Sequence, residues 1–360
     1  MVGGRGSESA HVVIGVDTHK DEHVAVAIDQ LGARLSEYRV ATTTKGYADL
    51  ERWSCSLGEV RAFGVEGTGA YGAGLARFLT SRGRTVVKVN RPDRSTRRRK
   101  GKSDPTDAEM AARAVLANVA DSTPKSGVGE VEMIRMLRNT RISALKARTQ
   151  ALNQMQALIV TAPAELQETL LGLTKVKLMS RCARLRPGEL TTPTAVAKHT
   201  LKSLARRCRQ LTIEIDSLRN ELSLLTSRAA PALINSFGVG PDSAAALLVT
   251  AGSNPERLNS EAAFAALCGV SPIPASSGKT NRHRLNRGGD RRANAALHRI
   301  VIVRLCFDDR TKTYMTRRTG EGMTKTEVIR CLKRYVAREV FRILREMRPD
   351  VALQTAARHL

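Results

Sequence analysis

The chain has 360 residues and carries 59 Lys and Arg against 34 Asp and Glu, which gives a formal net charge of +25 at pH 7. This length accommodates two or three domains with buried cores, and the positive excess favours a polyanionic partner, most commonly nucleic acid. A basic protein of ribosomal or chromatin type is the alternative, and we expect no membrane span because no apolar run approaches about 18 residues.

Aromatic residues make up 3% of the chain, so we expect contacts to phosphate through Arg and Lys more than base stacking. Segment 1–10 is polar and lacks the apolar core of a secretory signal, and we expect a disordered tail there. The cysteines are scattered without a CxxC pair, which predicts buried thiols in a reducing cytoplasm and neither disulfides nor a zinc site. They are Cys55, Cys182, Cys208, Cys268, Cys306 and Cys331.

Residues 11–125 form the first predicted domain, in which β-branched runs alternate with helical segments. An Ala- and Leu-rich helix is expected at 74–81. The alternation predicts an α/β sandwich with a mixed sheet. The strand-like runs are 11–16, 24–28, 61–65 and 85–89.

Residues 126–230 form a helical, highly charged middle region. Its later half repeats apolar residues at alternating spacings of three and four, which predicts the seam of a coiled coil. An earlier helix repeats Leu145, Leu152 and Ile159 at sevenfold spacing. We expect two long helices joined by a turn, which pack on each other as a self-contained hairpin or on another subunit, and we favour dimerisation. The seam residues are Leu201, Leu204, Cys208, Leu211, Ile215, Leu218, Leu222 and Leu225.

Residues 231–350 form the third predicted domain, which we expect to be mostly helical. Its segment FGVGP at 237–241 precedes an Ala- and Leu-rich helix and resembles a helix–hairpin–helix turn, whose backbone N–H groups bind phosphate. A plain turn between helices is the alternative. A basic loop at 278–292 and helices around 294–307 and 325–345 complete this domain.

Four acidic residues of the first domain suit a metal site. Asp17 and Glu66 each end a predicted strand beside small residues. Asp104 and Asp107 lie three apart at a helix start, and we expect Asp104 to be the N-cap before Pro105. Each acid alone also fits a simple strand end or helix cap. Together they would repel one another without a cation, and Mg²⁺ accepts such oxygen ligands. Two ions about 4 Å apart would serve phosphodiester cleavage.

Two basic segments are expected to bind nucleic acid. The segment at 91–102 precedes the helix with the paired aspartates, so it is either a solvated loop or a surface that brings phosphates to the metals. A second basic cluster follows the loop at 268–279 in the third domain. The predicted contacts are Arg94, Arg97, Arg98, Arg99, Lys100, Lys102, Lys279, Arg282, Arg284, Arg287, Arg291 and Arg292.

The loop CGVSPIPASSGK at 268–279 presents hydroxyl groups directly before this second cluster. A serine among guanidinium groups can attack a phosphodiester, because the cations stabilise the charge of the transition state. On chemistry alone, phosphate binding is the simpler interpretation of such a loop. His283 is expected to be a further contact more than a general base.

The fragments GVDTHK, VEGTGAYG, KSDPTDAEMAARA and GVSPIPASSG…NRGG occur in this order along the chain. The pattern resembles the DEDD-type transposases of bacterial insertion sequences, the one-ten family, from about residue 11 to residue 335. The resemblance implies a ribonuclease H-like (RuvC-like) first domain in which Asp17, Glu66, Asp104 and Asp107 bind metal. Gly67 stands where many relatives have a small hydroxyl residue.

The resemblance also implies that a serine followed by glycine in the last domain is the nucleophile. That residue is Ser277, with Ser276 as the neighbouring alternative. The implied partners are DNA, a structured noncoding guide RNA and further copies of the chain, with the acids of one subunit meeting the serine of another across the coiled coil. We expect a bacterial cytoplasmic protein that associates with the nucleoid when it acts.

Three functions remain open from the sequence. The leading one is a transposase or site-specific recombinase that mobilises its insertion sequence with a metal-binding DEDD site and a nucleophilic serine. The second is a RuvC-like, Mg²⁺-dependent junction nuclease that cuts with water. The third is a non-enzymatic, basic DNA-binding protein, against which the intact set of four acids argues.

Overall fold

The computed structural model describes residues 11–90, 103–254, 257–276 and 283–346. These residues form two compact units, and each is described by itself. Among the described residues, the first unit contains the chain up to Val128 together with Ala251–Ser260, and the second contains Gly129–Thr250 and the described residues from Glu261 onward. The expected tail at 1–10, the basic segment at 91–102 and residues 277–282 lie outside the described residues.

The first unit is built on a mixed sheet of five strands with the order β3-β2-β1-β4-β5. Strands β1, β2 and β3 are antiparallel neighbours, whereas β1 pairs in parallel with β4, and β4 with β5. This sheet confirms the predicted mixed α/β arrangement and is consistent with a ribonuclease H-like fold. The strands are β1 (His11–Thr18), β2 (Glu22–Asp29), β3 (Arg34–Ala41), β4 (Glu59–Glu66) and β5 (Val86–Val89).

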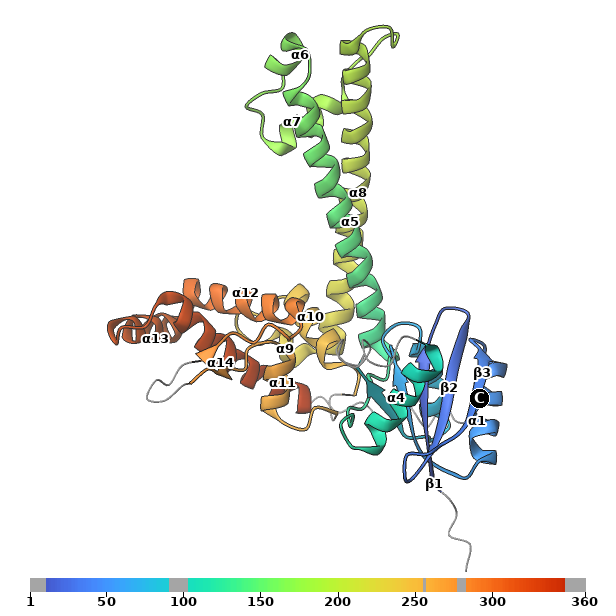
Figure 1. Ribbon diagram of the computed structural model, residues 1–360. Helices are drawn as coiled ribbons and strands as arrows, with labels where there is room; N and C mark the ends of the chain where they lie inside the picture. Colours follow the sequence, from blue (N-terminus) through green and yellow to red (C-terminus); the bar gives the residue numbers. More distant parts are fainter. Residues whose placement is uncertain (1–10, 91–102, 255–256, 277–282, 347–360) are drawn as a thin grey trace, which may run out of the picture. The chain divides into compact units, whose positions relative to one another are not determined.

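Helices cover both faces of this sheet (Figure 1). Because side chains alternate along a strand, Ile14 of β1 packs in the core beneath α1 (Thr44–Ser56) and α2 (Ala73–Ser81). Its neighbour Val13 packs on the other face, beneath α4 (Asp104–Leu116). The first unit therefore has three layers, with α4 alone among the described helices on its own face.

Strand β3 and helix α1 were not predicted. Most residues of β3 are partly or fully exposed, as is common for an edge strand, so the strand has little of the apolar alternation by which a strand is recognised. Helix α1 does have a readable start, since the hydroxyl of Thr43 accepts a hydrogen bond from the Gly46 N–H. Attention to this N-cap would have found the helix.

The second unit contains a pair of long helices, α5 (Gly129–Val160) and α8 (Pro193–Ala229), that pack on each other within one chain. Two short helices, α6 (Ala164–Glu168) and α7 (Lys175–Ala183), join them where a simple turn was expected. Along α8, every seventh residue is buried, and the seam residues between them are only half-buried. The buried set is Leu201, Cys208, Ile215 and Leu222.

The rest of the second unit is mostly helical, as predicted. The turn at 237–241 joins two helices, and Gly238 has the positive φ of +81° that only glycine adopts readily. A two-stranded hairpin within the serine-containing loop was not predicted. The elements are α9 (Pro231–Ile234), α10 (Pro241–Ala251), α11 (Glu261–Leu267), β6 (Ile273–Pro274), β7 (His283–Arg284), α12 (Arg291–Phe307), α13 (Asp309–Gly320) and α14 (Lys325–Glu346).

The cysteines only partly match the prediction of buried thiols. All six are free, but Cys55 and Cys306 are exposed, and three are fully buried. Burial raises the pKa of Cys268 to about 12 and that of Cys182 to about 11, so these thiols are poor nucleophiles. Of the described helices, none is long and apolar enough to cross a bilayer.

Candidate functional site

Helix α4 lies unusually close to the sheet because glycines face it. A Cβ on Gly15 of β1 would lie 1.9 Å from the carbonyl oxygen of Ala108, and one on Gly64 of β4 would lie 2.9 Å from that of Ala111. A real Cβ essentially never approaches another atom this closely. The two glycines therefore allow the helix backbone to rest directly on β1 and β4, and they fix where its first turn lies.

Asp17 and Glu66 lie side by side at the ends of these same strands. Val16 is opposite Val65 in the parallel register of β1 and β4, so the next residue on each strand is one of the two acids. By the alternation of the strands, both share the face of Gly15 and Gly64, which α4 covers. Only 8% of Asp17 and 5% of Glu66 is exposed.

The first turn of α4 adds Asp104 and Asp107. Asp107 is 3% exposed and belongs to the side of α4 that packs on the sheet. The prediction that Asp104 is the N-cap was wrong: Ser103 is the N-cap, and its hydroxyl accepts a hydrogen bond from the Thr106 N–H at 3.4 Å. A serine oxygen caps as well as an aspartate, so the carboxylate of Asp104, the first helical residue, is left to face Asp17.

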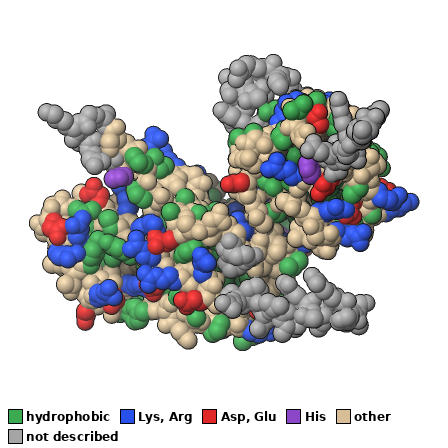
Figure 2. All heavy atoms as spheres, turned by 90° about the horizontal axis from the view of Figure 1, so that it is seen from below, with side chains coloured by type: hydrophobic (Ala, Val, Ile, Leu, Met, Phe, Trp, Pro, Cys, Tyr) green, Lys and Arg blue, Asp and Glu red, His purple; other side chains and the backbone are tan. Residues whose placement is uncertain are grey.

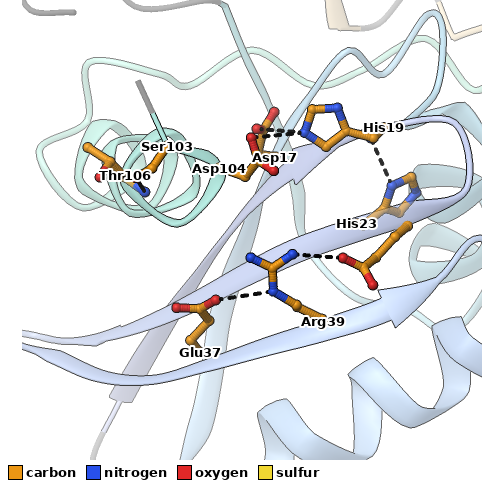
Figure 3. A network of polar contacts seen from close by, with 9 residues as sticks. Asp17, His19, His23, Glu37, Arg39, Ser103, Asp104 and Thr106 are labelled. Atoms are coloured by element: carbon orange, nitrogen blue, oxygen red, sulfur yellow. Dashed lines mark hydrogen bonds and ion pairs between the residues drawn. The ribbon is translucent and has the colours of Figure 1, made fainter. Parts of the chain in front are cut away.

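His19 lies between these carboxylates (Figure 3). Its Nε2 atom is 3.2 Å from Oδ2 of Asp17 and 3.4 Å from Oδ1 of Asp104. One ligand atom from each of the three residues lies within 4.8 Å of the other two. The sequence interpretation did not include His19, although the residue stands in the fragment GVDTHK only two positions after Asp17.

The turn that carries His19 is held by a second, buried histidine. The backbone N–H of His19 donates to Nδ1 of His23 at 3.3 Å, so His23 bears its proton on Nε2. The His23 ring is fully buried and stacks on Tyr47, with ring centroids 5.9 Å apart and an interplanar angle of 5°. Burial lowers the pKa of His23, and its neutral ring fixes the turn between β1 and β2.

The turn after β4 also depends on close contacts. Gly67 has a φ of +58°, and a Cβ there would lie 2.9 Å from the hydroxyl oxygen of Thr18. That hydroxyl donates to the carbonyl oxygen of Glu66 at 3.1 Å. The end of β4 is thus tied to the end of β1, which keeps the two strand-end acids together.

The electrostatics of the cluster favour a cation. Burial raises the pKa of Asp17, and the nearby carboxylates of Asp107 and Asp104 raise it further, while the charge of His19 and a hydrogen bond from the backbone of Thr18 lower it. A divalent ion would offset both the desolvation and the repulsion. Asp17, Asp104 and His19 have the spacing of ligands around one ion, and Asp107 and Glu66 add carboxylates on the same face, so the residues present fit a divalent metal.

The guanidinium group of Arg39, in β3, lies near the acid cluster (Figure 3). Its Nη1 atom donates a hydrogen bond to Oε1 of Glu22 at 2.9 Å, and its Nε atom lies 3.6 Å from Oε1 of Glu37. The hydrogen bond to Glu22 raises the pKa of Arg39, and the charge of Asp104 adds a smaller effect. Sequence reasoning missed this residue because β3 itself was missed.

The second unit contains the serine loop. Strands β6 and β7 pair antiparallel, with Ile273 opposite Arg284 and Pro274 opposite His283. Ser276 follows β6 and is exposed. Ser277, the predicted nucleophile, lies outside the described residues, as do Lys279 and Arg282.

Close contacts between glycines and the side chain of Asn294 hold the two ends of this loop together. A Cβ on Gly289 would lie 2.1 Å from the backbone nitrogen of Gly269, so the two ends of the loop touch through backbone alone. Asn294 donates to the carbonyl oxygens of Cys268 and Gly269 at 3.0 Å each, and it accepts from Nζ of Lys333 at 2.8 Å. These contacts explain the glycines and the asparagine that flank the loop.

The predicted basic contacts are only partly described. The described members are all exposed, and Arg292 also donates to the side chain of Asn139 at 2.7 Å. Lys and Arg side chains are spread among acidic ones over the face drawn in Figure 2. Residues 91–102, with the first basic cluster, lie outside the described residues. The described members are Arg284, Arg287, Arg291 and Arg292.

Comparison with known families gives two matches. Residues 14–162 match a transposase family of the IS110 type that is named for its DEDD acids, and residues 230–316 match the transposase IS116/IS110/IS902 family. The first match includes β1, β4, α4 and α5, and the second includes the serine loop. Residues 163–229, which contain α6, α7 and the whole of α8, lie between the two matches. No match to a curated protein was found.

Proposed function

The chain belongs to the IS110 family of transposases, and from that premise we propose how it cuts and rejoins DNA. As a DNA transposase it mobilises its own insertion sequence. We assign metal-dependent phosphodiester chemistry to Asp17, Glu66, Asp104 and Asp107, and the nucleophilic attack to a serine of the second unit.

The convergence of acids at one end of the sheet carries this proposal. Two strand ends and one helix start, far apart in the sequence, bring four acids to one face. Three of these side chains are largely buried, and burial disfavours the charged form of a carboxylate. A divalent cation would stabilise the charged carboxylates at this end of the sheet.

We propose Mg²⁺ as the cofactor, with two ions in the complete site. Such ions supply charge stabilisation at the phosphate and at the leaving oxygen. The carboxylates of the chain hold them with oxygen ligands. Because α4 rests directly on the sheet, its two aspartates keep a fixed distance from the strand-end acids.

The serine step is assigned to Ser277. Its hydroxyl oxygen forms a bond to phosphorus and loses its proton, while the bond from phosphorus to a deoxyribose oxygen breaks and that oxygen takes up a proton. A deoxyribose hydroxyl of a second strand then attacks the same phosphorus and loses its proton, the bond from phosphorus to the serine oxygen breaks, and the serine oxygen is reprotonated. Exposed guanidinium groups after the loop, such as Arg284 and Arg287, would stabilise the charge on the phosphate.

Partners follow from the same family. We propose that DNA binds through the two basic segments and that a structured noncoding RNA guides the choice of sites. We also propose that subunits associate through the helical region at 126–230, so that the acids of 11–125 in one subunit act with the serine of 231–350 in another. The buried seam of α8 is occupied by α5 of the same chain, so such association would use other faces of the helical pair. The proposed location is the bacterial cytoplasm, on the nucleoid.

A junction nuclease that uses water remains the second candidate, favoured by the RuvC-like acids taken alone. The two candidate functions differ in the nucleophile, which is the serine in the transposase and water in the nuclease. In the nuclease, cleavage survives Ser277→Ala and is lost in Asp104→Asn.

The test is transposition of a plasmid-borne copy of the element in cells that express each variant. We expect Asp17→Asn to abolish transposition, because it removes a charged oxygen ligand. Asp21→Asn is the matched control, since Asp21 is an exposed aspartate of the same turn. Wild-type transposition by Asp17→Asn would refute the proposed site.

A further inference from the structure

His19 lies among the acids of the proposed metal site, although the four-acid set does not include it. Its Nε2 atom lies 3.2 Å from an oxygen of Asp17 and 3.4 Å from an oxygen of Asp104. The side chain is about half exposed, at 48%, so its place among the carboxylates does not result from burial in a core.

The separations match those of neighbouring ligands on one ion. Ligand atoms about 2.1 Å from a metal and at right angles to each other lie about 3 Å apart. Ligands on opposite sides of an ion lie about 4 Å apart, which is longer than either distance at His19. Nε2 is therefore spaced from each of the two oxygens as neighbouring ligands on one ion would be.

The backbone supports this position for the imidazole. The N–H of His19 is bonded to the buried ring of His23, and that ring is held by its stack on Tyr47. The buried His23 ring therefore holds the turn that presents His19, and such support orients the side chain of a metal ligand.

We infer that His19 is a metal ligand, so that the proposed Mg²⁺ site is a mixed nitrogen and oxygen site, which also accepts Mn²⁺ and whose affinity for Mn²⁺ depends on the imidazole more than its affinity for Mg²⁺ does. Imidazole suits transition metals, whereas Mg²⁺ prefers oxygen ligands and water. This inference rests on the proposed metal site and adds a residue to it. The competing arrangement is a histidine that only hydrogen-bonds the carboxylates and never contacts the ion.

The experiment is pulsed EPR of the full-length protein loaded with Mn²⁺. A bound imidazole nitrogen gives a ¹⁴N modulation of the Mn²⁺ signal, and the modulation changes to that of ¹⁵N when the protein is made with ¹⁵N-histidine. The wild-type measurement alone decides whether a histidine is a ligand, even if a variant folds poorly.

Two variants identify the histidine. We expect the modulation to persist in His11→Ala and to vanish in His19→Ala. His11 is a matched control because it also lies beside a carboxylate, at 3.4 Å from Glu59, but at the opposite end of β1. In calorimetric titrations, His19→Ala should weaken Mn²⁺ binding by about tenfold or more and change Mg²⁺ binding much less.

Failure of the inference and failure of the proposed site give different results. Mn²⁺ that binds the wild type without any histidine modulation would overturn the role of His19 and leave the carboxylate site standing. No Mn²⁺ binding to the wild type would overturn both. Equal losses of Mn²⁺ and Mg²⁺ affinity in His19→Ala would refute the greater dependence of Mn²⁺ binding on the imidazole.

Discussion

The substitution Gly15→Ala tests whether the contact of α4 with the sheet builds the acid cluster. The new Cβ would lie 1.9 Å from the carbonyl oxygen of Ala108 and 2.4 Å from the nitrogen of Ala112. Both atoms belong to helix backbone and cannot rotate away. To restore a separation of at least 3.0 Å, α4 must retreat by about 1 Å, and the first turn with its two aspartates moves with it.

Two effects of different size follow. Overpacking of this kind costs about 1–3 kcal/mol of unfolding free energy. Metal sites tolerate only about 0.2 Å of change in ligand distance, so a movement of about 1 Å should remove most metal affinity even where the fold survives. We therefore expect Mn²⁺ binding to fall further than stability does.

Two assays and one control separate these effects. The single tryptophan, Trp53, packs against the core of the first unit, so its fluorescence during urea unfolding follows that unit. Calorimetry with Mn²⁺ reports the site. Gly69→Ala is the control, because a Cβ there meets nothing within 4 Å. The reasoning is refuted if Gly15→Ala matches both wild type and Gly69→Ala in stability and in Mn²⁺ affinity.

Three further predictions concern the second unit. Leu201→Ala should lower the free energy of unfolding by about 2–5 kcal/mol, because the Leu201 side chain is fully buried on α8. Leu224 is 68% exposed on the same helix, so Leu224→Ala should change the midpoint of urea unfolding little. Asp242→Asn should cost about 1–3 kcal/mol at pH 7, since it removes a carboxylate 2.7 Å from Arg299. Burial would raise the pKa of Asp242, but its arginine partners lower the pKa overall. The charged carboxylate therefore stabilises the fold above about pH 4. The loss of stability in Asp242→Asn should shrink as the pH falls below that value. Asn294→Ala should leave metal binding intact and speed amide hydrogen exchange at the base of the serine loop.

A specific outcome would contradict each of these three predictions. Equal stability of Leu201→Ala and Leu224→Ala would mean that α5 does not cover α8 as described. A cost of Asp242→Asn that grows toward low pH would contradict the direction of the pKa shift. Unchanged exchange in Asn294→Ala would show that the glycine contacts hold the loop without the amide.

The sequence predicted the elements that carry strong periodic patterns. Buried runs such as those of β1 and β4 are continuous and apolar, so both strands and the acids at their ends could be located. The edge strand β3 could not, because an exposed strand lacks that pattern. Periodicity along α8 correctly marked a helix with a buried seam, but the same pattern fits a partner in the same chain or in another, and only the fold shows that α5 fills it.

Fine details of the site depended on three-dimensional contacts. Ser103 and Asp104 are equally good caps by residue type, and the choice between them is made by which oxygen reaches the Thr106 N–H. His19 was overlooked because its role depends on a turn that folds back between two carboxylates. Neither fact has a signature in spacing alone.

The central claim is that acids of the first unit and a serine of the second act in one DNA strand-transfer reaction. The most direct measurement uses the element's junction DNA, its flanking noncoding RNA, Mg²⁺ and purified protein, with a denaturing gel to detect a covalent protein–DNA adduct. We predict an adduct with wild type and with Ser276→Ala, and none with Ser277→Ala or Asp17→Asn. Cleavage without an adduct in the wild type, or an adduct that persists in Ser277→Ala, would contradict the account.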